Sequence, residues 1–271
     1  MRIILSRKGF DMQYGGQPSP IMPDGTLLSF PIPEPADPMT YGELMYKGQS
    51  YFDLIKSLNP NTKLDHDSHC HLDPDLLSEP LYRYKGWRPL FGQTGAAQGH
   101  LAKCGIGRGD LFLFFGTFRK AELYQGILRY VKGAPEVHLV FGYLEVGKIH
   151  GGFENLEEKV AYHPHAQERF RERKNNCIYE ATEKLSLLPG KSGGGALKYH
   201  PNLVLTKEGY SKSRWDLPVF FKEVEISYHT RKSFKTDYFQ SASKGQEFVV
   251  KSNQSVLEWA KELIHCGSLN Q

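Results

Sequence analysis

Short apolar runs, separated by segments rich in glycine and proline, dominate the chain and predict strands more often than helices. The run at residues 2–6 predicts a strand, and the longer runs at 111–115 and 138–146 predict strands covered on both faces. Residues 127–131 and 203–206 predict two further short strands. The pattern therefore indicates a sheet with a buried centre.

Helical periodicity is clearest near the end of the chain. In residues 254–266 the apolar positions recur at helical spacing and Gly267 follows them, which predicts an amphipathic helix. Residues 94–104, closed by Gly105, predict a second and shorter helix.

Two further segments have features that are typical of helices. Residues 40–56 begin with Thr40, and Glu43 follows three positions later, the spacing of a capping box. The charged stretch at residues 166–174 also indicates a helix.

Glycine, proline and polar residues fill the connections. Seven prolines between residues 7 and 38 exclude a long helix there, and the sequence Pro23-Asp24-Gly25 predicts a turn within a hairpin at 20–32. Residues 64–76 form a loop rich in histidine and aspartate, and residues 191–195 predict a flexible glycine and serine loop.

These elements together predict an α/β fold in the broad sense, with a mixed, twisted sheet flanked by helices. No internal repeat or clean linker interrupts the chain, so residues 1–271 are expected to form a single compact domain. An alternative is that residues 109–147 form a small barrel.

Composition excludes a disordered chain, because 39% of residues are hydrophobic and 24% are charged. The net charge of +4 is too small to indicate nucleic-acid binding by itself, although it permits a basic groove. The chain opens on a strand pattern without a secretory or membrane-spanning segment, which predicts a cytoplasmic protein that does not bind a membrane. No Cys-x-x-Cys pair occurs, and reduced thiols are expected at four positions, Cys70, Cys104, Cys177 and Cys266.

A first cluster of candidate binding residues follows the first predicted strand, where α/β proteins often place ligand loops. Arg and Lys could hold a phosphate, the two glycines would allow close approach of the backbone, and the aspartate could bind a base or ribose, or act as a general base. A structural loop held by an Arg–Asp pair is the alternative. The cluster consists of Arg7, Lys8, Asp11, Gly15, Gly16 and Ser19.

The His/Asp-rich loop is the second candidate site. In an extended segment, His69, His71, Asp73 and Asp75 would point to one face, and His with carboxylate suits iron, zinc or manganese. A divalent metal is therefore a candidate cofactor. The alternatives are a catalytic or ligand-orienting role for His71, Asp73 or Asp75 without metal, and a polar loop in which an aspartate caps a turn.

Two weaker candidates complete the set. Trp87 could stack on a base and Gln93, Gln98 and His100 could hydrogen-bond to it, although a helix start beside a core tryptophan explains them as well. Glu247, between a glycine turn and an apolar strand, could serve as a general acid or base, or lie on the surface.

Histidine pairs elsewhere carry less weight, because His163 and His165 accompany no nucleophile motif and no G-x-S-x-G sequence occurs.

Several segments resemble the third family of nucleotide modification associated domains. This resemblance implies a role near modified DNA bases in bacteria and their phages, and it implies no catalytic residue. The segments span almost the whole chain: Ser6–Asp11, Tyr14–Ile21, His71–Leu76, Phe91–Gln98, Gly109–Asp110, Phe114–Gly116 and Gly245–Val249.

A second resemblance is to domains of the pseudouridine-synthase-associated and EVE type. It rests on the Gly109-Asp110 turn that enters an apolar strand and on the later strand Val140–Val146. It implies a small barrel that can hold a flipped base.

Three hypotheses follow from the sequence. The first is an enzyme that modifies a base or nucleotide, the second a non-catalytic reader of a modified base, and the third a metal-dependent hydrolase or oxygenase centred on residues 69–75. Nucleotide or DNA is the expected partner in each, alongside other base-modification proteins.

Overall fold

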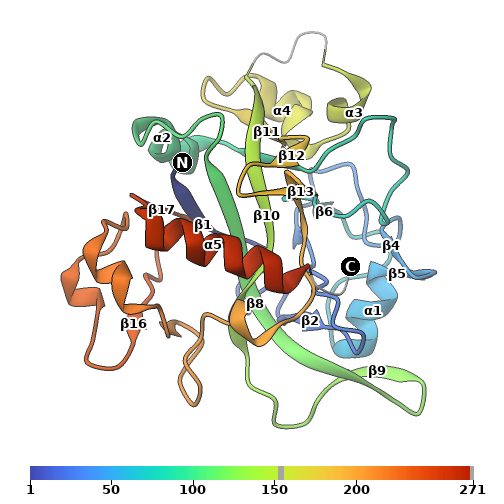
Figure 1. Ribbon diagram of the computed structural model, residues 1–271. Coiled ribbons are helices and arrows are strands. Elements are labelled where there is room, and N and C mark those ends of the chain that lie inside the picture. The colour runs from blue at the N-terminus through green and yellow to red at the C-terminus, as the bar shows by residue number, and fades with distance from the viewer. Residues whose placement is uncertain (152–155, 269–271) are drawn as a thin grey trace.

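The computed structural model describes residues 1–151 and 156–268, and a large mixed sheet lies at its centre (Figure 1). Six strands follow one another across the sheet in the order β17 (Glu247–Val250), β1 (Ile3–Arg7), β8 (Leu111–Tyr124), β10 (Val137–His150), β11 (Cys177–Ala181) and β7 (Leu90–Gln93).

β1 occupies a central position although it lies near the start of the chain. It runs parallel to β8, with Ile3 opposite Leu111, and antiparallel to β17, with Ser6 opposite Glu247. Its side chains are almost fully buried, as expected for a strand covered on both faces.

The two longest strands, β8 and β10, pair with each other and also with shorter strands. β8 and β10 pair antiparallel, and a bulge lies between Val140 and Gly142. Along its length β8 also pairs with β2 (Ser19–Ile21) and β9 (Ile127–Tyr130), while β10 pairs with β14 (Gly194–Ala196).

Helix α5 (Gln254–Gly267) lies across one face of the sheet (Figure 1). Asn253 caps its start, because the side-chain oxygen accepts a hydrogen bond from Val256 N at 3.1 Å. Its buried face, which includes Leu263 and Ile264, joins the same apolar cluster as the sheet. Burial of this face holds the end of the chain against the centre of the fold.

Smaller elements surround the sheet, and α1 covers a second apolar cluster. They are β3 (Ile32–Pro33), β4 (Met45–Tyr46), β5 (Gln49–Ser50), α1 (Tyr51–Leu58), β6 (Cys70–His71), α2 (Gly95–Lys103), α3 (Glu158–Ala161), η1 (Pro164–Ala166), α4 (Glu168–Arg171), β12 (Lys184–Leu185), β13 (Leu188–Ser192), η2 (Pro201–Leu203), β15 (Arg214–Trp215), η3 (Val219–Glu223), η4 (Arg231–Ser233) and β16 (Phe239–Gln240).

The prediction of a mixed sheet flanked by helices is confirmed. The strands expected at 2–6, 111–115 and 138–146 are β1 and parts of β8 and β10. The helices expected at 94–104 and 254–266 are α2 and α5. The apolar patterns of these buried segments were therefore sufficient to predict where the strands and helices lie.

The prediction of a helix at 40–56 is wrong for the first part of this range. Thr40 and Glu43 do bond to each other, but they close a turn and not a helix. A tight turn at Lys47 and Gly48, both with positive φ, then joins β4 to β5. The helix begins only at Tyr51, because Ser50 and Asp53 form the true capping box.

Three other expectations are corrected. Residues 191–195 contribute to β13 and β14 instead of a free loop, and residues 203–206 form isolated bridges instead of a strand. The strands within 109–147 belong to the large sheet, and no closed barrel occurs among the described residues. β8 pairs on its first half with β1, which leaves no edge to close a barrel.

No helix of the described chain has the length and apolar character needed to cross a membrane.

A buried histidine links β10 to β15. His138 is 6% exposed, and its Nδ1 accepts a hydrogen bond from Trp215 Nε1 at 3.1 Å. Burial lowers the pKa of His138 to about 3, so the ring is neutral at physiological pH.

Acid should therefore weaken the fold through His138. The unfolded chain binds a proton at this ring below about pH 6.5 and the folded chain does not, so stability falls as the pH decreases. Between pH 7 and pH 5 we expect this residue to remove about 2 kcal/mol from the free energy of unfolding. Urea unfolding at both pH values measures the loss.

The variant His138→Gln should lose less stability over this range than the wild type, while the exposed His265→Gln should behave as the wild type. Equal pH dependence in all three proteins would refute the assignment.

Candidate functional site

A hollow of about 400 Å³ opens at the end of the sheet where β1 and β7 end and β17 begins. We call it the central pocket. Its polar lining comes from segments far apart in the chain, and the residues used below are Arg7, Lys8, Asp11, His71, Asp73, Gln93, His165 and Gly245.

Two histidines and one carboxylate meet on one side of the central pocket. One ligand atom each from His71, Asp73 and His165 lies within 4.8 Å of the other two. β6 and the residues after it supply the first two, and η1 supplies the third. Two imidazoles and one carboxylate, with open positions towards a pocket, are a ligand set that suits iron or zinc.

The ring of His71 is oriented by an outer carboxylate. Its Nδ1 lies 2.5 Å from Asp37 Oδ2, and the other oxygen of Asp37 accepts from Arg169 at 2.5 Å. Nε2 is therefore the nitrogen that faces Asp73, whose Oδ2 lies 3.9 Å away. A carboxylate behind an imidazole is the usual outer partner of a metal-bound histidine.

The ring of His165 is oriented in a similar way. Asn176 donates through its amide nitrogen to the carbonyl oxygen of His165, which directs the amide oxygen towards Nδ1 at 2.7 Å. Nδ1 then carries the proton and Nε2 keeps a free lone pair. Burial lowers the pKa of His165 to about 3, so the ring is neutral and able to coordinate.

Asp73 stays charged although it is buried. Burial acts to raise the pKa of its carboxyl group, but the neighbouring His163 and the two other histidines hold that pKa below its usual range. Oδ1 accepts from Gly92 N at 2.7 Å and lies 3.4 Å from His163 Nε2. The carboxylate therefore keeps a fixed position and a full negative charge.

β7 approaches this cluster closely at Gly92. A Cβ atom at that position would lie 2.3 Å from the ring of His165. The absence of a side chain lets the strand pass the imidazole while its N–H binds Asp73.

A buried ion pair lies behind the pocket lining at Lys8 and Gln93. Glu247 is 1% exposed, and its Oε1 accepts from Lys8 Nζ at 3.0 Å and from Gln93 Nε2 at 2.7 Å. Lys8 also lies over the ring of Phe91, 4.5 Å from its centroid. The second oxygen of Glu247 has no partner among the described residues.

Other residues of the first predicted cluster form hydrogen bonds or ion pairs with the rest of the protein. Arg7 donates to the carbonyl oxygens of Ala242 and Ser243, and burial lowers the pKa of its guanidinium. Asp11 lines the pocket, but its Oδ1 accepts from the N–H groups of Gln13 and Tyr14 in a local turn. Lys8 is paired with Glu247 rather than open to a phosphate.

Three further residues of that cluster lie outside the pocket lining. Gly15 packs against the ring of Phe10 and Gly16 N bonds to the Asp11 carbonyl, both with positive φ. Ser19 is buried and accepts from Phe30 N. These three residues shape the loop.

His69 and Asp75 lie apart from the cluster of His71, Asp73 and His165. The strand alternation that grouped them ends at His71, because Asp73 N bonds back to the carbonyl of His71 in a turn. Asp75 instead forms an ion pair with Arg83, at 2.6 Å.

The predicted base-reading residues do not converge on one point. Trp87 donates to the hydroxyl of Tyr162, Gln98 accepts from Tyr179, and the ring of His100 contacts Ser227. Only Gln93 of this set lines the central pocket.

Sequence reasoning missed the third member of the cluster. In the sequence His165 forms only a weak pair with His163, and nothing in its spacing connects it with residues 71–73. The sequence His-Pro-His does predict a tight turn, with proline at the first helical position, and that turn is η1.

Residues 2–251 match the family described as Nucleotide modification associated domain 3. The chain belongs to this family. Membership associates the chain with nucleotide or DNA modification. Comparisons with curated proteins and with solved structures gave no match.

The family match includes every residue of the pocket lining named above, from Arg7 to Gly245, and the buried Glu247 beside it. The cluster of His71, Asp73 and His165 and the pair of Lys8 and Glu247 therefore both lie within the matched residues.

We expect Gly92→Ala to displace the ring of His165, because the new methyl group would overlap it. Affinity for a divalent probe such as Co²⁺ should fall by roughly tenfold or more, as for the loss of an outer metal-site partner. A Co²⁺ titration followed by visible absorbance measures the change. Gly190→Ala is the matched control, since no atom lies near its Cβ position, and equal loss in both variants would contradict the expectation.

Proposed function

We propose that this protein is a metal-dependent enzyme that modifies a base of a nucleotide or nucleic acid. The observation that carries the proposal is the cluster of His71, Asp73 and His165, with ligand atoms within 4.8 Å of one another at the wall of a pocket. Membership in a nucleotide-modification-associated family supports the choice of substrate class.

The residues present fit a divalent metal. Both imidazoles turn a free nitrogen inward, because Asp37 and Asn176 occupy their other nitrogens. Asp73 supplies negative charge, so three protein ligands leave further positions open to the pocket. A metal bound there would act as a Lewis acid or activate a bound small molecule.

Glu247, which Lys8 and Gln93 bind behind the pocket lining, could handle a proton during the reaction. Glu247 has one oxygen fixed by Lys8 and Gln93 and one without a partner among the described residues. A carboxylate with an oxygen that lacks a partner can act as a general acid or base. Substrate would therefore lie between the metal ligands and the side of the pocket near Glu247.

A non-catalytic reader is the second candidate function. It would require Trp87, Gln93 and Gln98 to present free polar groups to a base. The indole N–H of Trp87 is bonded to Tyr162 and the amide oxygen of Gln98 to Tyr179. The enzyme is therefore the better supported of the two.

Metal content tests the proposed ligands. We expect the wild type to bind one divalent ion per chain, measured by native mass spectrometry and elemental analysis, and His165→Ala to lose it. His69→Ala is the matched control, because His69 lies in the same histidine-rich loop but outside the cluster, and it should retain the ion. Retention in His165→Ala or loss only in His69→Ala would refute the proposed ligand set.

Base modification is tested on nucleic acid itself. DNA, RNA and nucleotides are incubated with metal-loaded wild type and with His165→Ala, and the nucleosides released by digestion are compared by mass. A nucleoside with altered mass that only the wild type produces supports the enzyme. Unaltered nucleosides, together with tight binding to modified DNA by both proteins, would favour the reader.

A further inference from the structure

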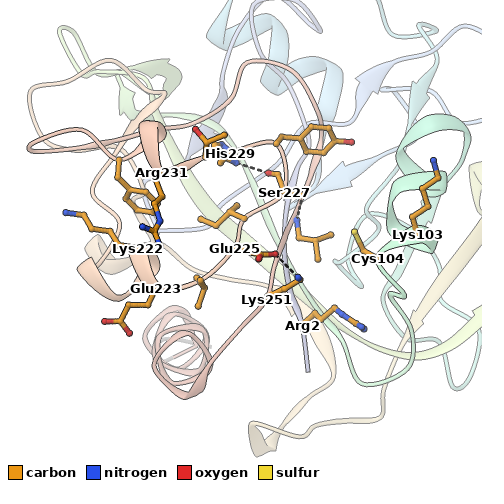
Figure 2. Close-up of a pocket in the computed structure, with 16 residues that line it drawn as sticks. Arg2, Lys103, Cys104, Lys222, Glu223, Glu225, Ser227, His229, Arg231 and Lys251 are labelled. Carbon is orange, nitrogen blue, oxygen red and sulfur yellow. Dashed lines mark hydrogen bonds and ion pairs between the residues drawn. The ribbon is translucent and has the colours of Figure 1, made fainter.

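A second and larger hollow, of about 780 Å³, lies beside the edge of the sheet formed by β17 (Figure 2). We call it the basic groove. Residues 222–231 form one side, and the end of α2, the residue before β1 and the end of β17 with the residue after it form the other. Its charged lining consists of five cations, Arg2, Lys103, Lys222, Arg231 and Lys251, and two carboxylates, Glu223 and Glu225.

Three of the five cations are not neutralised. Glu225 pairs with Lys251 at 2.6 Å, as Figure 2 shows, and Arg2 pairs with Asp110 at 3.4 Å. Lys103, Lys222 and Arg231 form no ion pair with any carboxylate in residues 1–151 and 156–268. Glu223 is the lining carboxylate without an ion pair among the described residues, so unpaired cations outnumber unpaired carboxylates and the groove keeps a positive potential that attracts a polyanion.

An exposed aromatic ring lies in the wall of the basic groove. Tyr228 is 53% exposed, and its backbone has φ of 64°, a conformation that aromatic residues rarely adopt. Its ring lies 4.7 Å from the ring of His100. An exposed aromatic ring in the same groove as unpaired cations is the combination on which unpaired bases stack in single-stranded nucleic-acid sites.

The basic groove and the central pocket share a wall. His229, which lines the groove, accepts from Ala242 N at 2.9 Å, and Arg7, which lines the pocket, donates to the carbonyl oxygen of Ala242. A Cβ at Gly245, on the pocket side, would lie 3.2 Å from the ring of Tyr228 on the groove side. Only residues 242–245 and their partners separate the two hollows at this point.

We propose that the basic groove binds the backbone of a single-stranded nucleic acid and delivers one base of that strand to the central pocket. The substrate is then a base within a polymer and not a free nucleotide. The cations hold the phosphates, and Tyr228 stacks on a neighbouring base, which requires that base to be unpaired. The modification of the delivered base rests on the proposed function, whereas the binding of the strand in the groove does not.

Oligonucleotide binding tests the inference directly. Fluorescence anisotropy is measured with a labelled DNA strand of about 12 nucleotides, and with RNA of the same sequence, at several salt concentrations. We expect Lys222→Gln with Arg231→Gln to weaken binding roughly tenfold or more at low salt. The slope of log affinity against log salt should decrease by about 1.4, since each phosphate contact to a single strand contributes about 0.7.

Tyr228→Asn separates stacking from charge, because asparagine tolerates positive φ but presents no ring. It should weaken binding by about fivefold or more and leave the salt slope unchanged. Lys132→Gln with Lys184→Gln is the matched control, since both lysines are exposed and neither lines the groove. This control should bind as the wild type does.

Three results would overturn the inference: equal weakening in the control pair, tighter binding of duplex than of single strand, or binding of a mononucleotide with the same dependence on Lys222 and Arg231. The DNA and RNA arms identify the sugar that the groove prefers.

Metal content separates this inference from the proposed function. The groove variants should keep the metal, and His165→Ala should lose the metal but still bind the strand. A metal-free wild type that binds single strands through the groove would refute the proposed function alone.

Discussion

The pairing of β1 between β8 and β17 brings together segments that are more than a hundred residues apart in sequence. Ile3 lies opposite Leu111 on one side and Val250 on the other, and the chain then leaves the sheet at Arg7 and Lys8. Because β17 runs in the opposite direction, its first residue, Glu247, lies beside the point where β1 ends. The Lys8–Glu247 ion pair, the part of the central pocket lined by Arg7 and Lys8, and the wall that the pocket shares with the basic groove all depend on this pairing.

Buried polar groups in the central pocket are costly unless each has a partner, and this cost explains how the cluster is arranged. The outer nitrogens of His71 and His165 are bonded to Asp37 and Asn176, so each ring is left with one nitrogen facing Asp73. Asp73 remains ionised because His163 and the backbone of Gly92 stabilise its charge. Such a fixed and charged arrangement is one that a divalent ion would complete.

The two hollows differ in the chemistry that they offer. The central pocket is the smaller of the two and holds buried groups with defined orientations, whereas the basic groove is larger and presents cations on long side chains. Phosphates make sequence-independent contacts with such cations, and a reacting base needs precise positioning. Placing the two hollows on either side of residues 242–245 would let one strand use both.

The sequence by itself determined those strands and helices in which buried apolar residues recur at regular spacing. It also determined the family to which the chain belongs. It also grouped His71 with Asp73, because two residues that close must remain neighbours in any fold. Only the tertiary structure decided that His165 completes their cluster while His69 and Asp75 do not, since a turn at Asp73 ends the alternation on which the prediction relied. The partnership of Lys8 with Glu247, and the position of Tyr228 beside Gly245, likewise arise from long-range strand pairing and packing, which no local pattern encodes.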